Sequence, residues 1–154
     1  MSDVVIDRMT EADLEEVLAI DVAAFHDPRD VREKQLREEL TRSWARIFVA
    51  RGDRGVVRGY LLFWHVADEA HVINVAVAPT ARRGGIGRAL VGRLLDYARE
   101  HAIAKVLLEV RASNEAAIGL YRSAGFTQFN LRPRYYGDGE DAVEMARELG
   151  PPLR

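Results

Sequence analysis

The sequence contains no cysteine, which excludes disulfides, thiolate metal sites and a cysteine nucleophile. It also lacks any apolar run near the roughly 20 residues that a membrane-spanning helix needs. The acidic start, MSDVVIDRMTEADLEE, has neither the basic nor the apolar region of a signal peptide. The net charge of −2 argues against direct nucleic-acid binding. We therefore expect a cytoplasmic protein that binds neither a membrane nor nucleic acid.

Two further kinds of site find no support in the sequence. No Gly-Lys pair occurs, which excludes a Walker phosphate loop. The histidines show no spacing typical of metal ligands, so we expect no metal. These histidines are His26, His65, His71 and His101.

The composition that is present is typical of a globular protein. Apolar residues make up 48% and charged residues 30% of the 154 residues, which suits one domain with a substantial core. We expect residues 1–148 to form this domain and residues 149–154 to form a C-terminal tail. A monomer is the default expectation.

Hydrophobic periodicity predicts alternating strands and helices along the whole chain. A Thr-x-x-Asp box at Thr10 and Asp13 begins the first helix, and Ser113 is expected to cap the last helix before Gly125 ends it. Strands are expected at residues 4–6, 47–50, 56–66, 71–78, 105–111, 126–132 and 141–147, with further helices over 31–43 and from residue 86. The three strands between residues 47 and 78 are expected to form an antiparallel meander.

The most informative segment is NVAVAPTARRGGIGRA, at residues 74–89. An apolar strand runs through a proline into an arginine-flanked glycine turn and then into an amphipathic helix. Gly84, Gly85 and Gly87 let backbone N–H groups face outward, and the first turn of the helix adds unpaired donors and partial positive charge. This combination predicts a site for a phosphate-bearing ligand.

The glycine spacing separates the possible ligands. A dinucleotide fingerprint would need a third glycine or alanine where Leu90 stands, although Glu109 could serve as its ribose-binding acid. A tight turn without any ligand is the plainest alternative. The pattern Gln/Arg-x-x-Gly-x-Gly/Ala is met by Arg82, Gly85 and Gly87, and it resembles the acyl-CoA pyrophosphate loop of the GCN5-related N-acetyltransferases (the GNAT superfamily).

The second half of the chain extends this resemblance. The segment LEVRASN at 108–114, then LY at 120–121 and GF at 125–126, resembles the bacterial ribosomal-protein-alanine N-acetyltransferase (RimI) family. So do RPRYY at 132–136 and GEDA at 139–142 with Met145. The resemblance is close over residues 70–148 and implies an α+β (α/β three-layer) GNAT-type domain. Its mixed, mostly antiparallel seven-stranded sheet would have splayed central strands and four flanking helices.

The resemblance also implies acetyl-CoA as cosubstrate. Its pantetheine arm would enter the gap between the strand ending at Ala78 and the strand 105–111, and pair there with backbone groups of Val75, Ala76 and Val77. Asn114 would bond to the cofactor from the start of the next helix. The diphosphate would be held by Arg82, Arg83, Gly84, Gly85, Ile86, Gly87 and Arg88.

Glu109 is the candidate general base. Strand alternation places it on one face with Leu107 and Arg111, so an acid is set into an otherwise apolar strand. Pairing with Arg111 or Lys105 as a surface glutamate is the alternative. A free glutamate is a poor base at neutral pH, so its pKa must be raised by burial, or it must act through water.

The resemblance makes Tyr121 the acid that protonates the departing thiolate, whereas its apolar helical face also suits a plain core tyrosine. Tyr135 and Tyr136 are expected to overhang the acceptor channel or to form an aromatic clasp on the final hairpin. Arg132 would favour an acidic substrate group or solvate a strand end.

The acceptor implied by the resemblance is the N-terminal α-amine of a protein, with a ribosomal protein as one candidate. Many family members carry an aromatic Pro-Trp segment after the first helix, where this chain has FHDPRD at residues 25–30. A lysine side chain or a small amine therefore stays open as acceptor, and so does a non-catalytic acyl-CoA-binding module.

Overall fold

The computed structural model describes residues 4–82 and 84–150 and contains seven strands and four α-helices. The strands are β1 (Val5–Arg8), β2 (Ala45–Arg51), β3 (Val57–Val66), β4 (Glu69–Val77), β5 (Lys105–Arg111), β6 (Thr127–Arg132) and β7 (Ala142–Glu148). The helices are α1 (Leu14–Phe25), α2 (Arg29–Thr41), α3 (Ile86–Glu100) and α4 (Glu115–Ser123), with short 3-10 turns at Glu11–Asp13, Asp53–Gly55 and Pro79–Ala81. Among the described helices, none combines the length and apolar character needed to cross a bilayer.

All seven strands join one sheet in the order β1-β2-β3-β4-β5-β7-β6. Strands β1 to β4 form the predicted antiparallel meander, β4 and β5 run parallel, and β7 inserts antiparallel between β5 and the edge strand β6. The predicted mixed, mostly antiparallel seven-stranded sheet is therefore confirmed.

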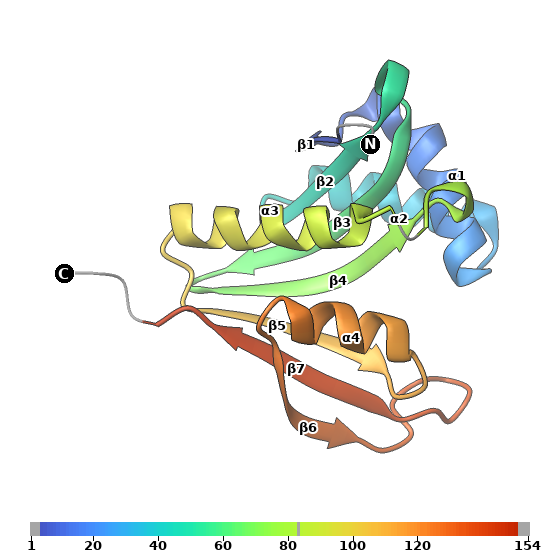
Figure 1. The fold of residues 1–154 in the computed structure, drawn as a ribbon. Coiled ribbons are helices and arrows are strands. Elements are labelled where there is room, and N and C mark those ends of the chain that lie inside the picture. Colours follow the sequence, from blue (N-terminus) through green and yellow to red (C-terminus); the bar gives the residue numbers. More distant parts are fainter. Residues whose placement is uncertain (1–3, 83, 151–154) are drawn as a thin grey trace.

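Helices lie on both sides of this sheet and create a three-layer domain (Figure 1). Helices α1 and α2 pack on one face of β2, β3 and β4, where Leu18, Leu36 and Tyr60 belong to one apolar cluster. Helices α3 and α4 lie on the other face, over a second and larger cluster that includes Leu94 and Leu108. The amphipathic patterns of the helices therefore produce two cores, one on each face of the sheet.

A β-bulge in β4 opens the middle of the sheet. Leu62 of β3 lies opposite Asn74 and Phe63 lies opposite Val72, so Ile73 is the extra residue on the β4 strand. Pairing of β4 with β5 runs only from Glu69 to Val72 and stops at this point. A bulge bends its strand and increases the local twist, so beyond Val72 the two parallel strands diverge. The predicted splay between the central strands is confirmed.

The element boundaries differ from the predicted ones mainly at the helix starts. The box between Thr10 and Asp13 is present, with Thr10 N–H donating to Asp13 Oδ2 at 2.8 Å, but a 3-10 turn precedes α1. The prediction that Ser113 caps the last helix is wrong. Asn114 is the N-cap, and its Oδ1 accepts from Ala117 N–H at 3.1 Å. Serine and asparagine cap equally well, so adjacent candidates cannot be separated by residue type.

The C-terminal end of the described chain continues past β7. Leu149 N–H donates to Ala104 O at 2.8 Å, and its side chain packs against the larger core. Residues 151–154 of the predicted tail lie outside the described residues.

Candidate active site

A cavity of about 280 Å³ lies where β4 and β5 diverge. Side chains or backbone from both strands, from α4, from the end of α1 and from the loop between β6 and β7 line it. The lining residues are Phe25, Val72, Ile73, Asn74, Val75, Glu109, Val110, Arg111, Asn114, Ala117, Tyr121 and Tyr136. Six of the residues singled out from the sequence therefore meet at one cavity, namely Val75, Glu109, Asn114, Tyr121, Tyr136 and, from the acceptor loop, Phe25.

Glu109 lies on the wall of this cavity and accepts two side-chain hydrogen bonds. His71 Nε2 of β4 is 2.6 Å from Glu109 Oε2, and the Tyr135 hydroxyl is 3.2 Å from Glu109 Oε1. The predicted alternative, a surface pair with Arg111 or Lys105, is wrong. Arg111 instead pairs with Asp138 and Glu140, and Lys105 with Glu148.

The hydrogen bond from His71 lowers the pKa of Glu109 below its usual value, and this effect outweighs the opposing effect of burial. The same contact raises the pKa of His71 above 6.5. Of the two expected alternatives, a raised pKa does not apply, because a donor on the neighbouring strand stabilises the carboxylate; action through water is the other. Glu109 is ionised at neutral pH, as a proton acceptor must be.

Tyr121 lies in α4, on the opposite side of the gap. Only 6% of its surface is exposed, and burial raises the pKa of its hydroxyl to about 12. Its ring packs on Phe126, while the residue also lines the cavity. Among the described residues the hydroxyl has no hydrogen-bond partner. The phenol is thus protonated at neutral pH and free to donate into the cavity.

The glycine turn leads from the 3-10 turn after β4 into α3. Gly85 has φ of 81°, the left-handed conformation that favours glycine, and Gly84 and Gly85 are both exposed. A second cavity of about 310 Å³ beside the turn is lined in part by Arg82, Gly84 and Ile86, together with Arg58 of β3. Arg83 lies outside the described residues.

These features fit a phosphate-bearing thioester that extends from the turn into the gap. The first-turn N–H groups of α3 have no acceptor within their own helix and suit a diphosphate. Beyond Val72 no strand pairs with the β5 side of β4 in the described chain, so backbone groups near Val75 and Val77 are free to pair with a pantetheine amide. The side chain of Ala76, between these two residues, lies in the core under α1 and α2.

The loop between β6 and β7 forms the rim of the cavity. Tyr135 and Tyr136 pack edge to face with ring centroids 5.1 Å apart, and the Arg111 guanidinium lies 4.1 Å from the Tyr136 ring centroid. Tyr135 is 43% exposed and also contacts Arg132, which pairs with Glu144 at 3.0 Å. The two rings therefore pack as an aromatic clasp, of which Tyr136 lines the cavity.

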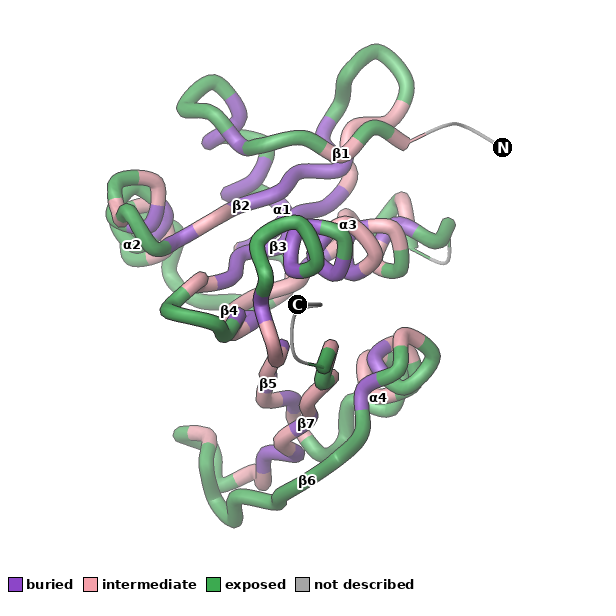
Figure 2. Tube along the Cα trace, turned by 90° about the vertical axis from the view of Figure 1, so that its left-hand side faces the viewer, coloured by how far each residue is buried: buried purple, intermediate pink, exposed green. Residues whose placement is uncertain are grey.

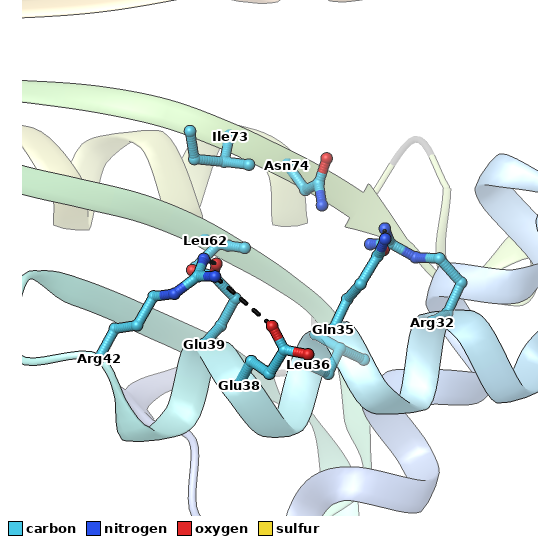
Figure 3. A pocket seen from close by; sticks show the side chains of 9 residues that line it. All are labelled: Arg32, Gln35, Leu36, Glu38, Glu39, Arg42, Leu62, Ile73 and Asn74. Atoms are coloured by element: carbon cyan, nitrogen blue, oxygen red, sulfur yellow. Dashed lines mark hydrogen bonds and ion pairs between the residues drawn. The ribbon is translucent and has the colours of Figure 1, made fainter.

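A further cavity of about 270 Å³ lies on the α2 side of β4 and shares Ile73 and Asn74 with the first. Figure 3 shows Arg32 and Gln35 of α2 extending toward Asn74, and Arg42, directly after α2, paired with Glu38. In the amide orientation that satisfies both of its ends, Asn74 accepts a hydrogen bond from Arg32 at 3.1 Å. The two residues at the bulge thus form the wall between two adjoining cavities.

A family model described as Acetyltransferase (GNAT) family matches residues 13–126. The chain belongs to this family. The resemblance seen in the sequence thus agrees with the structure, which has the GNAT fold, its splayed strands and the glycine turn at the start of α3.

Relatives of this GNAT domain include ribosomal-protein N-acetyltransferases. The ribosomal protein bS18-alanine N-acetyltransferase of Escherichia coli is 45% identical over 95 residues, which cover 60% of this chain and 64% of that enzyme. The chain thus aligns with somewhat less than two thirds of that enzyme's length. N-alpha-acetyltransferase RimI of Mycobacterium tuberculosis is 47% identical over 85 residues, which cover 54% of this chain and 52% of the relative.

The fold comparison covers more of both chains. The crystal structure of the Escherichia coli ribosomal-protein-S18-alanine N-acetyltransferase matches with a TM-score of 0.85 and 34% identity, over 96% of this chain and 95% of that one. The whole GNAT domain, including its amino-terminal half, therefore shares the architecture of that enzyme.

Sequence reasoning missed His71 and Asn74 in this GNAT site. Spacing along the chain bears on the histidines only as metal ligands, and within residues 4–82 and 84–150 no group of three potential ligands could hold a metal. The position of His71 in its strand could have indicated its contact with Glu109. His71 is opposite Leu107 in the parallel β4–β5 pair, which places it on the same face as Glu109, one alternation further along β5.

Proposed function

We propose that this GNAT domain transfers the acetyl group of acetyl-CoA to the N-terminal α-amine of a protein, with a ribosomal protein as one candidate. The observation that carries the proposal is the placement of two groups on one cavity. Glu109, an ionised carboxylate, lies on the β5 side of the gap, and Tyr121, a protonated phenol, lies on the α4 side.

Acetyl-CoA supplies the acetyl group as an activated thioester. The backbone of β4 around Val75 to Val77 would hold the pantetheine arm, and the turn containing Gly84, Gly85 and Gly87 would hold the diphosphate with Arg82, Ile86 and Arg88. Arg83 is proposed for the same site from the sequence alone. Asn114 lines the cavity from the N-terminus of α4 and would bond to the cosubstrate there.

Each catalytic group has one task. Glu109 would take the proton from the acceptor nitrogen, directly or through water, and Tyr121 would give its proton to the sulfur as the carbon–sulfur bond breaks. A positioned acid or base of this kind contributes about 10² to 10⁴ in rate. The acetyl group then leaves on the acceptor nitrogen as an amide.

The strength of the base favours an α-amine. The pKa of Glu109 lies below its ordinary value, so the carboxylate is a weak base. An α-amine has a pKa near 7.7 to 8.0 and a lysine near 10.4, so the neutral α-amine costs roughly 3 to 4 kcal/mol less to reach at pH 7. A weak base is sufficient for an α-amine and poorly suited to a lysine side chain.

The shape of the site favours an acceptor larger than one amine. The two cavities that share Ile73 and Asn74 offer room beyond the reacting nitrogen. Tyr136 lines the cavity and the Tyr135 hydroxyl contacts Glu109, so the following peptide residues would pass these two side chains. Arg132 stands behind Tyr135 and would favour an acidic group on the acceptor.

A peptide-library assay tests this function directly. The purified protein is incubated with acetyl-CoA and peptides of varied first residue, and released CoA is measured together with peptide mass. We expect acetylation at the α-amine, abolished in peptides whose terminus is already acetylated. Acetylation confined to lysine side chains or to polyamines would overturn the proposed acceptor. Binding of acetyl-CoA without turnover of any amine would leave only the non-catalytic binding module.

A further inference from the structure

The histidine that contacts Glu109 is not itself part of the cavity. His71 Nε2 lies 2.6 Å from Glu109 Oε2, and because that carboxylate is ionised, the ring nitrogen must donate. The His71 side chain is 39% exposed and the Glu109 side chain 16% exposed. Glu109 lines the cavity whereas His71 does not. His71 can therefore act on a reaction in the cavity only through Glu109.

Charged groups surround this pair on three sides. On β7, Glu144 lies directly opposite Glu109 and pairs with Arg132 of β6. On β4 itself, Glu69 precedes His71 by one strand alternation. On β3, Trp64 lies opposite His71, and beyond Trp64 the acid Glu39 of α2 and the base Arg42, directly after α2, contact its ring. The acids near His71, Glu109 foremost and then Glu144 and Glu69, stabilise its protonated form.

We infer that His71 is the positioning residue of the base, aiming the Glu109 carboxylate at the acceptor, and that the charge on His71 sets the pH below which the enzyme loses activity. The inference rests on the proposed function in that it assumes an amine acceptor. It applies to whichever amine the enzyme acetylates.

Two states of the pair account for the second part of the inference. Below the raised pKa of His71, the imidazolium holds Glu109 as a very weak base. Above it, neutral His71 still donates from Nε2, but the carboxylate faces no full positive charge there and is more basic. The acceptor nitrogen then gives its proton to Glu109 more readily, because base efficiency rises with base strength.

The test compares a variant that keeps the hydrogen bond with one that removes it. Glutamine can donate from its amide nitrogen but cannot titrate, whereas leucine can do neither. We expect the His71→Gln variant to keep more of the wild-type kcat/KM at pH 8.5 than His71→Leu keeps. At pH 5.5, kcat/KM of the wild type should fall about tenfold or more below that of His71→Gln, because a group with a pKa of 6.5 or above is at most about 10% neutral there. His71→Leu should lose about tenfold at pH 8.5, because the carboxylate is no longer aimed.

Parallel pH profiles for the wild type and His71→Gln would overturn the inference. Equal activity of His71→Leu at pH 8.5 would overturn the positioning role. The matched control is His101→Gln, a histidine at the far end of α3 that stacks on Tyr97. Both the kcat/KM of this control and its dependence on pH should follow those of the wild type.

An NMR titration of the imidazole in the free protein gives a readout without turnover. We expect the pKa of His71 to lie above 6.5 in the wild type and to fall in Glu109→Gln. A wild-type pKa at or below 6.5 contradicts the pair. If another amine is acetylated and no protein N-terminus is, the proposed acceptor is wrong. The pH profiles are then measured with that amine. Failure of the proposed acceptor is therefore distinguishable from failure of the inference about His71.

Discussion

The two sides of the β4–β5 gap differ in what covers the sheet. Strands β2 to β4 lie between α1 and α2 on one face and α3 on the other, whereas β5, β7 and β6 are covered by α4 on one face only (Figure 1). Figure 2 shows the same contrast, with long buried stretches in β2 and β3 and an exposed β6. The covered half provides most of the core, and the half that is open on one face displays charged side chains.

Charged groups are handled differently in the two halves. In the covered half, Asp21 is fully buried and accepts two bonds from Arg32, at 2.6 and 2.7 Å, and a third from the Tyr60 hydroxyl. On the open face, His71 and Glu109 form a partly exposed pair. Burial makes the loss of a partner costly in the first group, while partial exposure leaves the second able to titrate and react.

The largest expected effect is on turnover, from a change in the half that holds α4. Tyr121→Phe removes only the hydroxyl that we assign as proton donor. We expect kcat to fall by about 10² to 10⁴, with acetyl-CoA affinity by calorimetry nearly unchanged. Tyr97→Phe, which removes a hydroxyl bonded to His65 at the other end of the sheet, should keep wild-type turnover. Unchanged turnover in Tyr121→Phe would remove this residue from the mechanism.

The next effect is on stability, from a change in the covered half. Asp21→Ala leaves the Arg32 guanidinium and the Tyr60 hydroxyl without their shared partner. We expect the free energy of unfolding to fall by about 3 to 5 kcal/mol in chemical denaturation. Glu33→Ala, which breaks an exposed pair with Arg37, should cost about 0.3 to 0.5 kcal/mol. Similar losses in both variants would show that burial is not what separates the two halves.

The smallest expected effect is on stability, from alanine substitutions at two glycines of one segment, the start and the interior of α3. Gly85 has φ of 81° at the start of the helix, and Gly92 lies in its interior, with open space around both Cα atoms. Gly85→Ala should lower the free energy of unfolding by about 1 to 2 kcal/mol through backbone strain alone and weaken acetyl-CoA binding. Gly92→Ala should raise it by about 0.5 to 1 kcal/mol and leave binding unchanged. A loss of binding in both variants would contradict the assignment of the turn.

Local sequence patterns predicted most of this fold because its elements are strongly periodic. The strand from Lys105 to Arg111 has the predicted bounds, because a charged residue stands at each end of a largely apolar run. The second helix begins two residues earlier than expected, at Arg29 directly after Pro28. Proline is well tolerated next to a helix start, so it marks the region rather than the first residue.

The site was harder to predict because it depends on contacts between distant strands. Glu109 and Tyr121 follow from a motif, but the motif does not give the direction of the pKa shift of Glu109, which is downward. That direction follows from His71, which lies 38 residues away in the sequence. The bulge at Ile73 has no marker in its own residue type, because isoleucine is an ordinary strand residue.

The bulge at Ile73 also exchanges the faces on which odd-numbered and even-numbered residues of β4 lie. Side chains alternate with a period of two along a strand, so one inserted residue exchanges inside and outside for the rest of the strand. Ala70 and Val72 before the bulge and Val75 and Val77 after it face the larger core, and Ala76 faces the smaller one, so the change from even to odd numbers occurs at Ile73. Deleting one codon at this position would remove the bulge, keep Val75, Ala76 and Val77 on their present faces, and let the two parallel strands close together, leaving a continuous sheet with nowhere for a thioester to lie.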